Sequence, residues 1–324
     1  MLVYKNKEKY SLQKISKEIY IFANFINIYC YNIVMKKQTL QKRANIANNV
    51  MNYIYKYIDT DINIDDLAIQ LEISKFHLHR IFKEEFGKNI YECIKDIRLI
   101  KASNLLISNK NSTITEISKM IGYSSQTSFL RAFKQRFKMT PKQWKNNGYK
   151  DYSNNILKES VSAINSKADF TNLEPKIVKM SSINCYYLRH QGYDKSIKNT
   201  WQKLQTWLYS NDIENFTQIA LHHDNPIITN LKDCQYIACV SSIESVDNCS
   251  LPKLVIPSGV YARFSLKGVY GDVLKLIQWV YHSWLINSGY ETSTNPSFTI
   301  YHKNHFLSDD KMFDLDYYVP IKFI

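Results

Sequence analysis

Two arginines stand at matching places in two similar stretches of the sequence. Leu78-x-Arg80-x-Phe82 returns as Phe129-x-Arg131-x-Phe133, 51 residues further along the chain. An arginine side chain can form two hydrogen bonds with O6 and N7 of a guanine, the commonest specific contact between a protein and a DNA base. The alternative for each arginine is an ion pair within its own helix, for example of Arg80 with Glu84.

Further residues beside the arginines would point outward from the same two predicted helices. Apolar side chains such as Phe76 and Leu130 suit the methyl group of thymine, although a packing role is the alternative for Phe76. Lysines such as Lys83 and Lys134 are expected at phosphates, where they add affinity and salt dependence without sequence preference. The predicted DNA-binding residues are Lys75, Phe76, His79, Arg80, Lys83, Gln126, Thr127, Ser128, Leu130, Arg131 and Lys134.

Each set of residues lies on the second helix of a predicted helix-turn-helix unit. In the first unit, Ser74 can cap the second helix. In the second unit, Gly122 ends a short helix and Ser124 or Ser125 caps the next. Residues 89–108 have apolar side chains at helical spacing and predict one long connecting helix. Such a helix would hold both units on one side of a duplex, with the recognition helices about one turn of DNA apart.

The charge of the chain is concentrated in its first half. Residues 1–150 contain 26 Lys and Arg against 12 Asp and Glu, a net charge of +14, whereas residues 151–324 contain 16 against 17, a net charge of −1. A genome rich in lysine codons is the alternative explanation, but it would spread the positive charge evenly. The distribution therefore favours a polyanionic partner for the first half. At 324 residues the chain is long enough for two domains.

The segment 45–147 carries many residues in the order and spacing of one known domain. These are Leu67-Ala68, Ser74, Leu78-x-Arg80-x-Phe82-Lys83, Phe86-Gly87, Arg98, Ala102, Leu105-Leu106, Ile117, Gly122-Tyr123, Phe129-x-Arg131-x-Phe133-Lys134, Phe137 and Thr140-Pro141. Through them the segment resembles the DNA-binding domain of the AraC/XylS family of transcriptional regulators. The resemblance implies an all-α domain, at 45–148, that reaches DNA bases with the outward residues named above. Lys138 and Cys93 depart from the family pattern, which usually has Gly and Tyr there, and both departures concern loop geometry.

Residues 1–44 are expected to be an N-terminal extension. Their most apolar stretch, 19–35, is short and contains three Asn, so neither a membrane-spanning helix nor a signal peptide is expected. Translation from Met35 is an alternative start of the native protein. The six cysteines form no C-x-x-C pair. The sequence therefore predicts no metal site, no cofactor and no disulfide framework, and a reducing cytoplasm fits.

The second half has a different texture. Residues 149–172 are polar and without firm periodicity, which predicts a linker. Within 173–324 a Tyr precedes a Trp-Leu pair by 14 residues twice, at Tyr193 and at Tyr270, with an offset of 77. Predicted strands flank each predicted helix, which gives two β-α-β-β repeats related by a pseudo-twofold axis. The expected fold is multidomain: an all-α double helix-turn-helix domain followed by an α+β domain with a cleft between its halves.

A second known domain is similar to residues 173–324. The residues that carry this resemblance are Gly259-x-Tyr261, Gly268, Trp284-Leu285, Ser288-Gly289-Tyr290, Pro296-x-Phe298-x-x-Tyr301 and Val319-Pro320. They resemble the GyrI-like effector-binding domain, which occurs attached to AraC-type DNA-binding domains. The resemblance implies binding of hydrophobic or cationic small molecules among aromatic side chains, often with a buried glutamate as countercharge.

The expected ligand pocket follows from the same resemblance. Its predicted residues are Tyr187, Trp284, Phe298, Thr299, Tyr301, Asp316 and Tyr317, and a plain core role is the alternative for the aromatic ones. Thr299 stands where the glutamate is normally found, which disfavours a cationic ligand. Asp316 could replace that carboxylate only if it points into the cleft.

These features together predict a sequence-specific DNA-binding transcriptional regulator, with double-stranded DNA, RNA polymerase and a hydrophobic or aromatic small-molecule effector as partners. The resemblance implies activation more often than repression. One alternative is a DNA-binding protein whose C-terminal domain docks a protein. Another is a hydrolase of small molecules, but the absence of the glutamate at Thr299 counts against it, so no enzymatic activity is expected.

Overall fold

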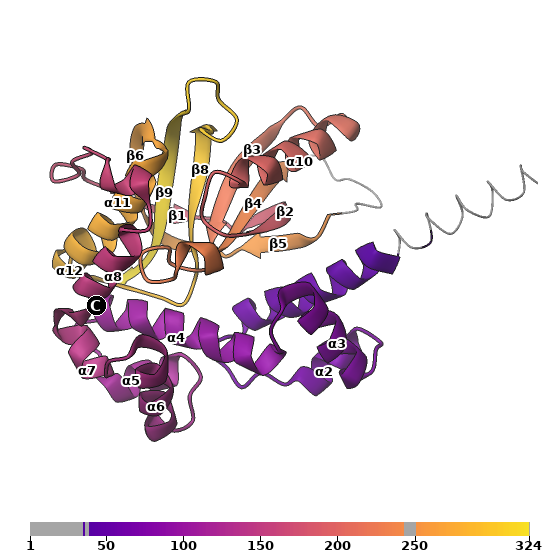
Figure 1. Ribbon diagram of the computed structural model, residues 1–324, viewed down its shortest axis with the longest axis horizontal. Coiled ribbons are helices and arrows are strands. Elements are labelled where there is room, and N and C mark those ends of the chain that lie inside the picture. Colours follow the sequence, from indigo (N-terminus) through magenta and orange to yellow (C-terminus); the bar gives the residue numbers. More distant parts are fainter. Residues whose placement is uncertain (1–34, 36–38, 243–250, 324) are drawn as a thin grey trace, which may run out of the picture.

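The computed structural model describes residues 35, 39–242 and 251–323, and it places a group of helices against a large β-sheet (Figure 1). Residues 39–56 form a helix, so the helical part begins before residue 45. The predictions made for residues 1–34, including Cys30, and for Cys249 lie outside the described residues. Within the described ranges, no helix is both long and apolar enough to cross a bilayer.

Two helix-turn-helix units form, as the sequence predicts. Their helices are α2 (Ile64–Gln70) and α3 (Lys75–Phe86), then α5 (Ile114–Met120) and α6 (Gln126–Phe137). The Ser74 hydroxyl accepts a hydrogen bond from the backbone N–H of His77 at 3.3 Å, and the Ser125 hydroxyl accepts one from Ser128 at 3.4 Å. Each recognition helix therefore begins with a side-chain cap, which satisfies a backbone donor that the helix leaves free.

The long connecting helix α4 (Ile90–Ser108) joins the two units. It begins with a capping box, in which Asn89 and Glu92 exchange side-chain-to-backbone hydrogen bonds. The side chain of Ile97 packs in the core of the first unit, and that of Ile100 packs in the larger core shared with the sheet domain. Helix α4 is therefore buried on several sides and fixes both units to the rest of the chain.

The segment predicted to be a linker is largely helical, so that prediction is wrong for most of 149–172. After α7 (Pro141–Gln143) and η1 (Trp144–Gly148), where the chain kinks at Asn146 and Asn147, come α8 (Tyr149–Leu157) and α9 (Val161–Ile164). Tyr149, Ile156 and Leu157 are buried, and α9 contacts α11 (Tyr270–Trp279) of the sheet domain. The sequence does not indicate the helix α8, because its few apolar residues stand among Asn, Ser and Lys.

The sheet domain is built around nine antiparallel strands within the described residues. They are β1 (Lys176–Met180), β2 (Ile183–Gln191), β3 (Phe216–His222), β4 (Gln235–Ser242), β5 (Lys253–Ile256), β6 (Gly259–Val269), β7 (Tyr290–Thr292), β8 (Ser297–Lys303) and β9 (Met312–Phe323). The order across the sheet is β1-β6-β9-β8-β3-β4-β2-β5, and β7 pairs with β9. Strands β3 and β8 meet at the centre, where Ala220 lies opposite Thr299.

The two predicted β-α-β-β repeats are present, and the strand order adds a feature that the sequence did not predict. The first repeat is β2, α10 (Ile197–Ser210), β3 and β4; the second is β6, α11 (Tyr270–Trp279) with η3 (Val280–Trp284) and α12 (Leu285–Asn287), then β8 and β9. The strand that precedes each repeat pairs with the other one: β1 lies beside β6, and β5 lies beside β2. The halves are therefore interlocked at both edges of the sheet.

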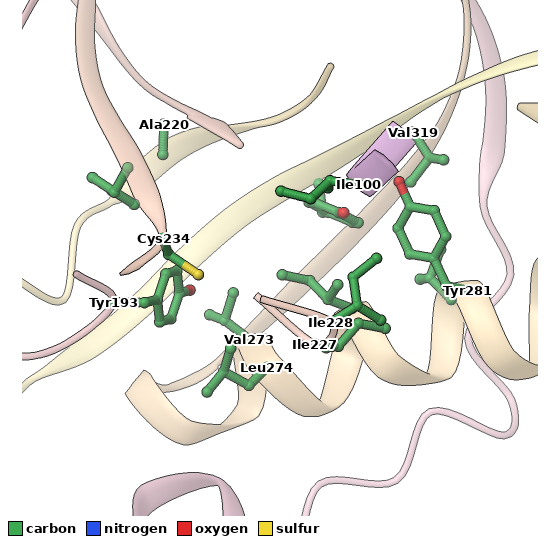
Figure 2. Packing of buried hydrophobic residues seen from close by; sticks show 14 of the residues in the cluster. Ile100, Tyr193, Ala220, Ile227, Ile228, Cys234, Val273, Leu274, Tyr281 and Val319 are labelled. Atoms are coloured by element: carbon green, nitrogen blue, oxygen red, sulfur yellow. The ribbon is translucent and has the colours of Figure 1, made fainter. Parts of the chain in front are cut away.

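The main hydrophobic core runs through both parts of the molecule. Figure 2 shows Ile100 of α4 beside Val319 of β9 and Tyr281 of η3, and the same cluster continues to Val273 and Leu274 of α11. The first helix-turn-helix unit has a smaller core of its own, and a third cluster covers the other face of the sheet. The two parts are therefore packed together as one body rather than joined by a flexible tether.

Candidate nucleic-acid interface and ligand sites

The outward face of α3 carries the predicted DNA-binding residues of the first unit. Phe76 is 88% exposed, so the packing alternative for this side chain is wrong. Arg80 and Lys83 are also exposed. Lys75 forms an ion pair with Asp65 of α2 at 2.7 Å, which links the start of α3 to the first turn of α2. An exposed aromatic ring among cations is a surface suited to the edge of a DNA groove.

Among the described residues, no carboxylate forms an ion pair with Arg80. Its Nη2 lies 3.0 Å from Nδ1 of His77, one turn earlier on the same helix. Glu84, the partner that sequence spacing offered, forms an ion pair with Arg43 of the N-terminal helix instead. The ion-pair alternative for Arg80 is therefore wrong, and its guanidinium group keeps donors available for a base.

His79 lies at the edge of the same face, in a partly covered position. Its ring is 5.6 Å from the ring of Tyr91, which is itself 55% exposed at the start of α4. Burial, and then the nearby Lys75 ammonium, lower the pKa of the His79 imidazole, so the ring is neutral at pH 7 and can either donate or accept a hydrogen bond. Sequence reasoning missed Tyr91, because its place outside the recognition helix gave no signal.

The second recognition helix presents its predicted residues without exception to solvent. The exposed side chains of α6 include Gln126, Thr127, Ser128, Leu130, Arg131 and Lys134. Arg131 has no ion-pair or hydrogen-bond partner among the residues that the structure describes. Phe129, Phe133 and Phe137 are fully buried on the opposite side of the helix. This strict division leaves a polar, cationic strip on α6 that matches the strip on α3.

Arg98 of α4 connects the second unit to the turn that follows the N-terminal helix. Its Nε donates to the carbonyl of Ile58 at 3.1 Å, and its Nη2 donates to the carbonyl of Thr60 at 2.7 Å. The same guanidinium group lies against Gly122, at the turn between α5 and α6, where an added Cβ would meet Nη2 at 2.6 Å. One side chain thus contacts segments that support each of the two recognition helices.

The two departures from the family pattern are accommodated locally. Lys138 ends α6 in the left-handed conformation, with φ of 59°, and Gly87 ends α3 in the same conformation, with φ of 70°. The turn that glycine usually makes is therefore preserved at Lys138 with some backbone strain. Cys93 is buried beside Met51, with the two sulfur atoms 3.8 Å apart.

The predicted ligand residues do not form one pocket, because they lie on both faces of the sheet. Thr299, Tyr301 and Tyr317 face the helices, with Thr299 and Tyr317 each 1% exposed. Tyr187 and Phe298 face the other side, where they belong to a separate apolar cluster. Neighbouring residues of a strand point to opposite faces, so pairs such as Phe298 and Thr299 could not have lined the same cavity.

Asp316 and Trp284 also lie away from the expected cleft. Asp316 alternates with Tyr317 and so faces the side opposite Thr299, where its carboxylate accepts from Ser265 and lies 3.1 Å from His302 Nε2. It does not replace the glutamate that the family usually has. The centre of the Trp284 ring lies 4.9 Å from that of Phe264. Trp284 therefore packs between its helix and the sheet.

The space beside Thr299 is small. The Thr299 hydroxyl lies 3.1 Å from Nε2 of His222, and the Tyr317 hydroxyl donates to Ser297 at 3.1 Å. Burial lowers the pKa of the His222 imidazole to about 4, so this group is neutral and serves as a hydrogen-bond partner inside the domain. The adjoining cavity measures about 30 Å³, which suits bound water rather than an effector.

Polar contacts link the helical part to the sheet domain close to the first recognition helix. The Tyr187 hydroxyl and the Arg189 guanidinium of β2 donate to the side-chain oxygens of Asn48 and Asn52, at 2.9–3.2 Å. The Arg189 guanidinium also lies 5.9 Å from the ring centre of Phe86, the last residue of α3. Tyr187 is therefore an interdomain contact, a role that its position in the sequence did not reveal.

The described residues offer no obvious metal centre, since no group of three or more His, Cys, Asp or Glu side chains could hold an ion there. The cysteines that the structure describes, Cys93, Cys185, Cys234 and Cys239, are buried free thiols. Cys234 and Cys239 pack in clusters on opposite faces of the sheet.

Comparison with known proteins agrees with this division of the chain. Residues 67–147 match a family described as a helix-turn-helix domain, and residues 173–322 match one described as the GyrI-like small molecule binding domain. A curated relative, "Probable transcription factor PqrA" of Proteus vulgaris, is 38% identical over 109 residues, which are 32% of this chain and 88% of the relative.

Two further similar proteins each match about a third of this chain. The "Xylose operon regulatory protein" of Escherichia coli (strain K12) is 38% identical over 107 residues, 33% of this chain but only 26% of that protein. Among solved structures, the C-terminal domain of AraT, a response regulator from Geobacillus stearothermophilus, has 30% sequence identity and a TM-score of 0.30 over 32% of this chain and 84% of that one. In the xylose regulator, the similarity leaves most of the relative's own length unmatched.

Proposed function

Because the chain belongs to the AraC family of DNA-binding transcriptional regulators and carries a GyrI-like domain, we propose that it reads a specific DNA sequence through the outward faces of α3 and α6. The observation that carries the proposal is the matched exposure of Arg80 and Arg131 on two capped helices, neither of them paired with a carboxylate in the described structure. Guanine is the base that each arginine would bind.

The surrounding side chains support the same reading. Phe76 and Leu130 offer apolar contacts for thymine methyl groups, and Gln126 suits adenine. Lys83 and Lys134 would neutralise phosphates, which makes the affinity depend on salt. In Figure 1 α5 and α6 lie below α4, on the side away from the β-sheet, and α2 and α3 lie at the opposite end of α4.

The test is binding of the full chain to the DNA upstream of its own and neighbouring genes, measured at two salt concentrations with random duplex as competitor. We expect site-selective binding that persists at the higher salt, because base contacts do not depend on counterion release. Binding that disappears at the higher salt and shows no sequence preference would mean that the helical part binds DNA only through its positive charge. That outcome would overturn the proposal.

We further propose that a small molecule modulates this DNA binding and that the protein acts mainly as an activator in contact with RNA polymerase. The match of residues 173–322 to a small molecule binding domain supports the first statement. The small space beside Thr299 favours, taken alone, the alternative in which the C-terminal domain docks a protein. Addition of candidate effectors to the DNA-binding assay separates the two, because only a bound effector changes the affinity for the site.

We propose no enzymatic activity. The relatives named above are transcription regulators, and Thr299 offers no carboxylate to activate water at the place where a glutamate normally stands.

A further inference from the structure

A pocket of about 540 Å³ lies between the helical part and the sheet domain. Its helical side is lined by Asn52, Tyr55 and Lys56 of the N-terminal helix and by Lys101 of α4. Its sheet side is lined by Leu254 and Val255 of β5, among others. This volume lies within the range of small-molecule sites, and pockets between domains are a preferred place for them.

Lys101 is the unusual residue of this pocket. It is 8% exposed, and its ammonium group donates to the carbonyl of Thr294. Within the described residues it forms no ion pair; Asp224 and Asp59 act on it only from a greater distance. Burial lowers the pKa of the Lys101 ammonium to about 8, so the group still carries its charge at pH 7. A buried cation that contacts no carboxylate is costly unless a ligand supplies a direct countercharge.

The remaining walls combine aromatic, apolar and cationic groups. The rings of Tyr55 and His223 stack with centres 3.6 Å apart, and both residues line the pocket, as do Pro257 and Pro296. Burial, followed by the charge of Arg189 and Lys101, holds the pKa of the His223 imidazole well below its usual range. Asp59 is the acidic residue of the lining, against the lysines at 56, 101 and 253.

We infer that this interdomain pocket binds a small amphipathic anion, with an apolar or aromatic body against Tyr55, Leu254 and Val255 and a carboxylate, sulfonate or phosphate group on Lys101. The cavity supplies the volume, and the buried ammonium group supplies the countercharge. The excess of cationic lining residues favours a ligand with negative charge. The inference names the ligand class and site of the proposed effector and rests on the proposed function for its regulatory meaning.

The position of the pocket gives such a ligand a means of action. Asn52 lines the pocket and also accepts from Tyr187 and Arg189, and Arg189 lies against Phe86 at the end of α3. A ligand that contacts both parts of the chain shifts any equilibrium between their relative positions, provided that it binds one position more tightly.

The experiment uses the full chain and two fluorescent probes with the same aromatic body. One is 1-anilinonaphthalene-8-sulfonate, which is anionic, and the other is N-phenyl-1-naphthylamine, which lacks the sulfonate. We expect saturable binding of both probes to the unaltered protein. Lys101→Met shortens the side chain by one atom and removes the charge, and it should weaken the anionic probe about tenfold or more while leaving the neutral probe unchanged.

Two further variants complete the design. Lys95→Met removes an exposed lysine of the same helix α4 and should change neither probe. Val255→Trp, at a residue that is 58% exposed and lines the pocket, should weaken both probes by filling the space. An unchanged near-UV circular dichroism spectrum of the Lys101 variant establishes that this variant is folded, because hydrophobic probes also bind molten globules.

The inference is overturned if the anionic probe fails to bind saturably, if Lys101→Met leaves its affinity unchanged, or if Val255→Trp leaves both probes unaffected. Probe binding is measured without DNA. A protein that binds the anion but no specific site would therefore refute the proposed function alone, and one that reads a site but fails the probe test would refute this inference alone.

Discussion

At the residue scale, base reading depends on side chains that the fold leaves unpaired. Arg80→Ala and Arg131→Ala should each weaken binding to the specific site by about 1–3 kcal/mol, because each removes a bidentate base contact. Lys83→Ala, a phosphate contact, should weaken all duplexes alike and reduce the salt dependence. Titrations of each variant with the specific site and with random duplex measure both effects. Equal losses on the two duplexes for both arginine variants would contradict the assignment.

The lowered pKa of Lys101, about 8 against the ordinary 10.5, leads to a second prediction. Between these values the folded chain binds fewer protons than the unfolded chain, so stability rises with pH across this window, and burial of the charge costs stability below it. Lys101→Met removes that cost. The free energy of unfolding of the variant, relative to the unaltered protein, should therefore be higher at pH 7 than at pH 10, by up to about 3 kcal/mol.

Urea unfolding of both proteins at several pH values between 7 and 10 measures this difference. The other lysines and tyrosines titrate equally in the two proteins, so only Lys101 contributes to the change. A difference that does not vary with pH would mean that Lys101 titrates as an ordinary exposed lysine.

At the element scale, the turn between α5 and α6 depends on Gly122. Its φ is +77°, and a Cβ would lie 2.6 Å from Arg98 Nη2. Gly122→Ala should lower the free energy of unfolding by about 2–3 kcal/mol, since it adds left-handed strain and displaces the Arg98 hydrogen bonds. Gly87→Ala is the matched control, because φ is +70° but nothing lies within 4 Å of the added Cβ; strain alone should cost about 1 kcal/mol. Equal losses in urea unfolding would show that the contact with Arg98 is unimportant.

Local sequence signals were sufficient for the elements that have caps and a single buried face. Ser74 and Ser125 start the recognition helices, Phe129 and Phe133 mark the buried side of α6, and apolar spacing indicates α4. Helix α8 could not be recognised in the same way, because its stability comes from packing against the sheet domain and its own sequence is polar.

The ligand pocket was mispredicted for a physical reason. Both faces of the sheet are buried, one under helices and one beside the N-terminal helix, so alternation along a strand does not distinguish cleft from core. The sequence therefore assigns Phe298 and Thr299 to one site, although they lie on opposite faces of the sheet. The same holds for Asp316 and Tyr317. The burial of Lys101 could not be predicted from the sequence, because a lysine on a long helix is ordinarily exposed.

At the scale of the whole molecule, the contacts between β2 and the N-terminal helix predict energetic coupling. Arg189 donates to Asn48 at 2.9 Å across the interface. Arg189→Ala, Asn48→Ala and the double variant form a cycle whose coupling free energy should be about 0.5–1.5 kcal/mol. Urea unfolding of the four proteins measures it. Additive effects of the two substitutions would mean that the two parts do not hold this arrangement in solution.

The strand order determines when the sheet domain can be completed during synthesis. Strand β9 (Met312–Phe323) lies between β6 and β8 in the middle of the sheet, yet it follows both along the chain. During synthesis the helical part can fold first, but the sheet stays divided until residues 312–323 have left the ribosome. Until then the surface around Ile100 of α4 lacks its neighbour Val319 of β9. A newly made chain therefore passes through a stage in which it has both recognition helices but no finished sheet domain.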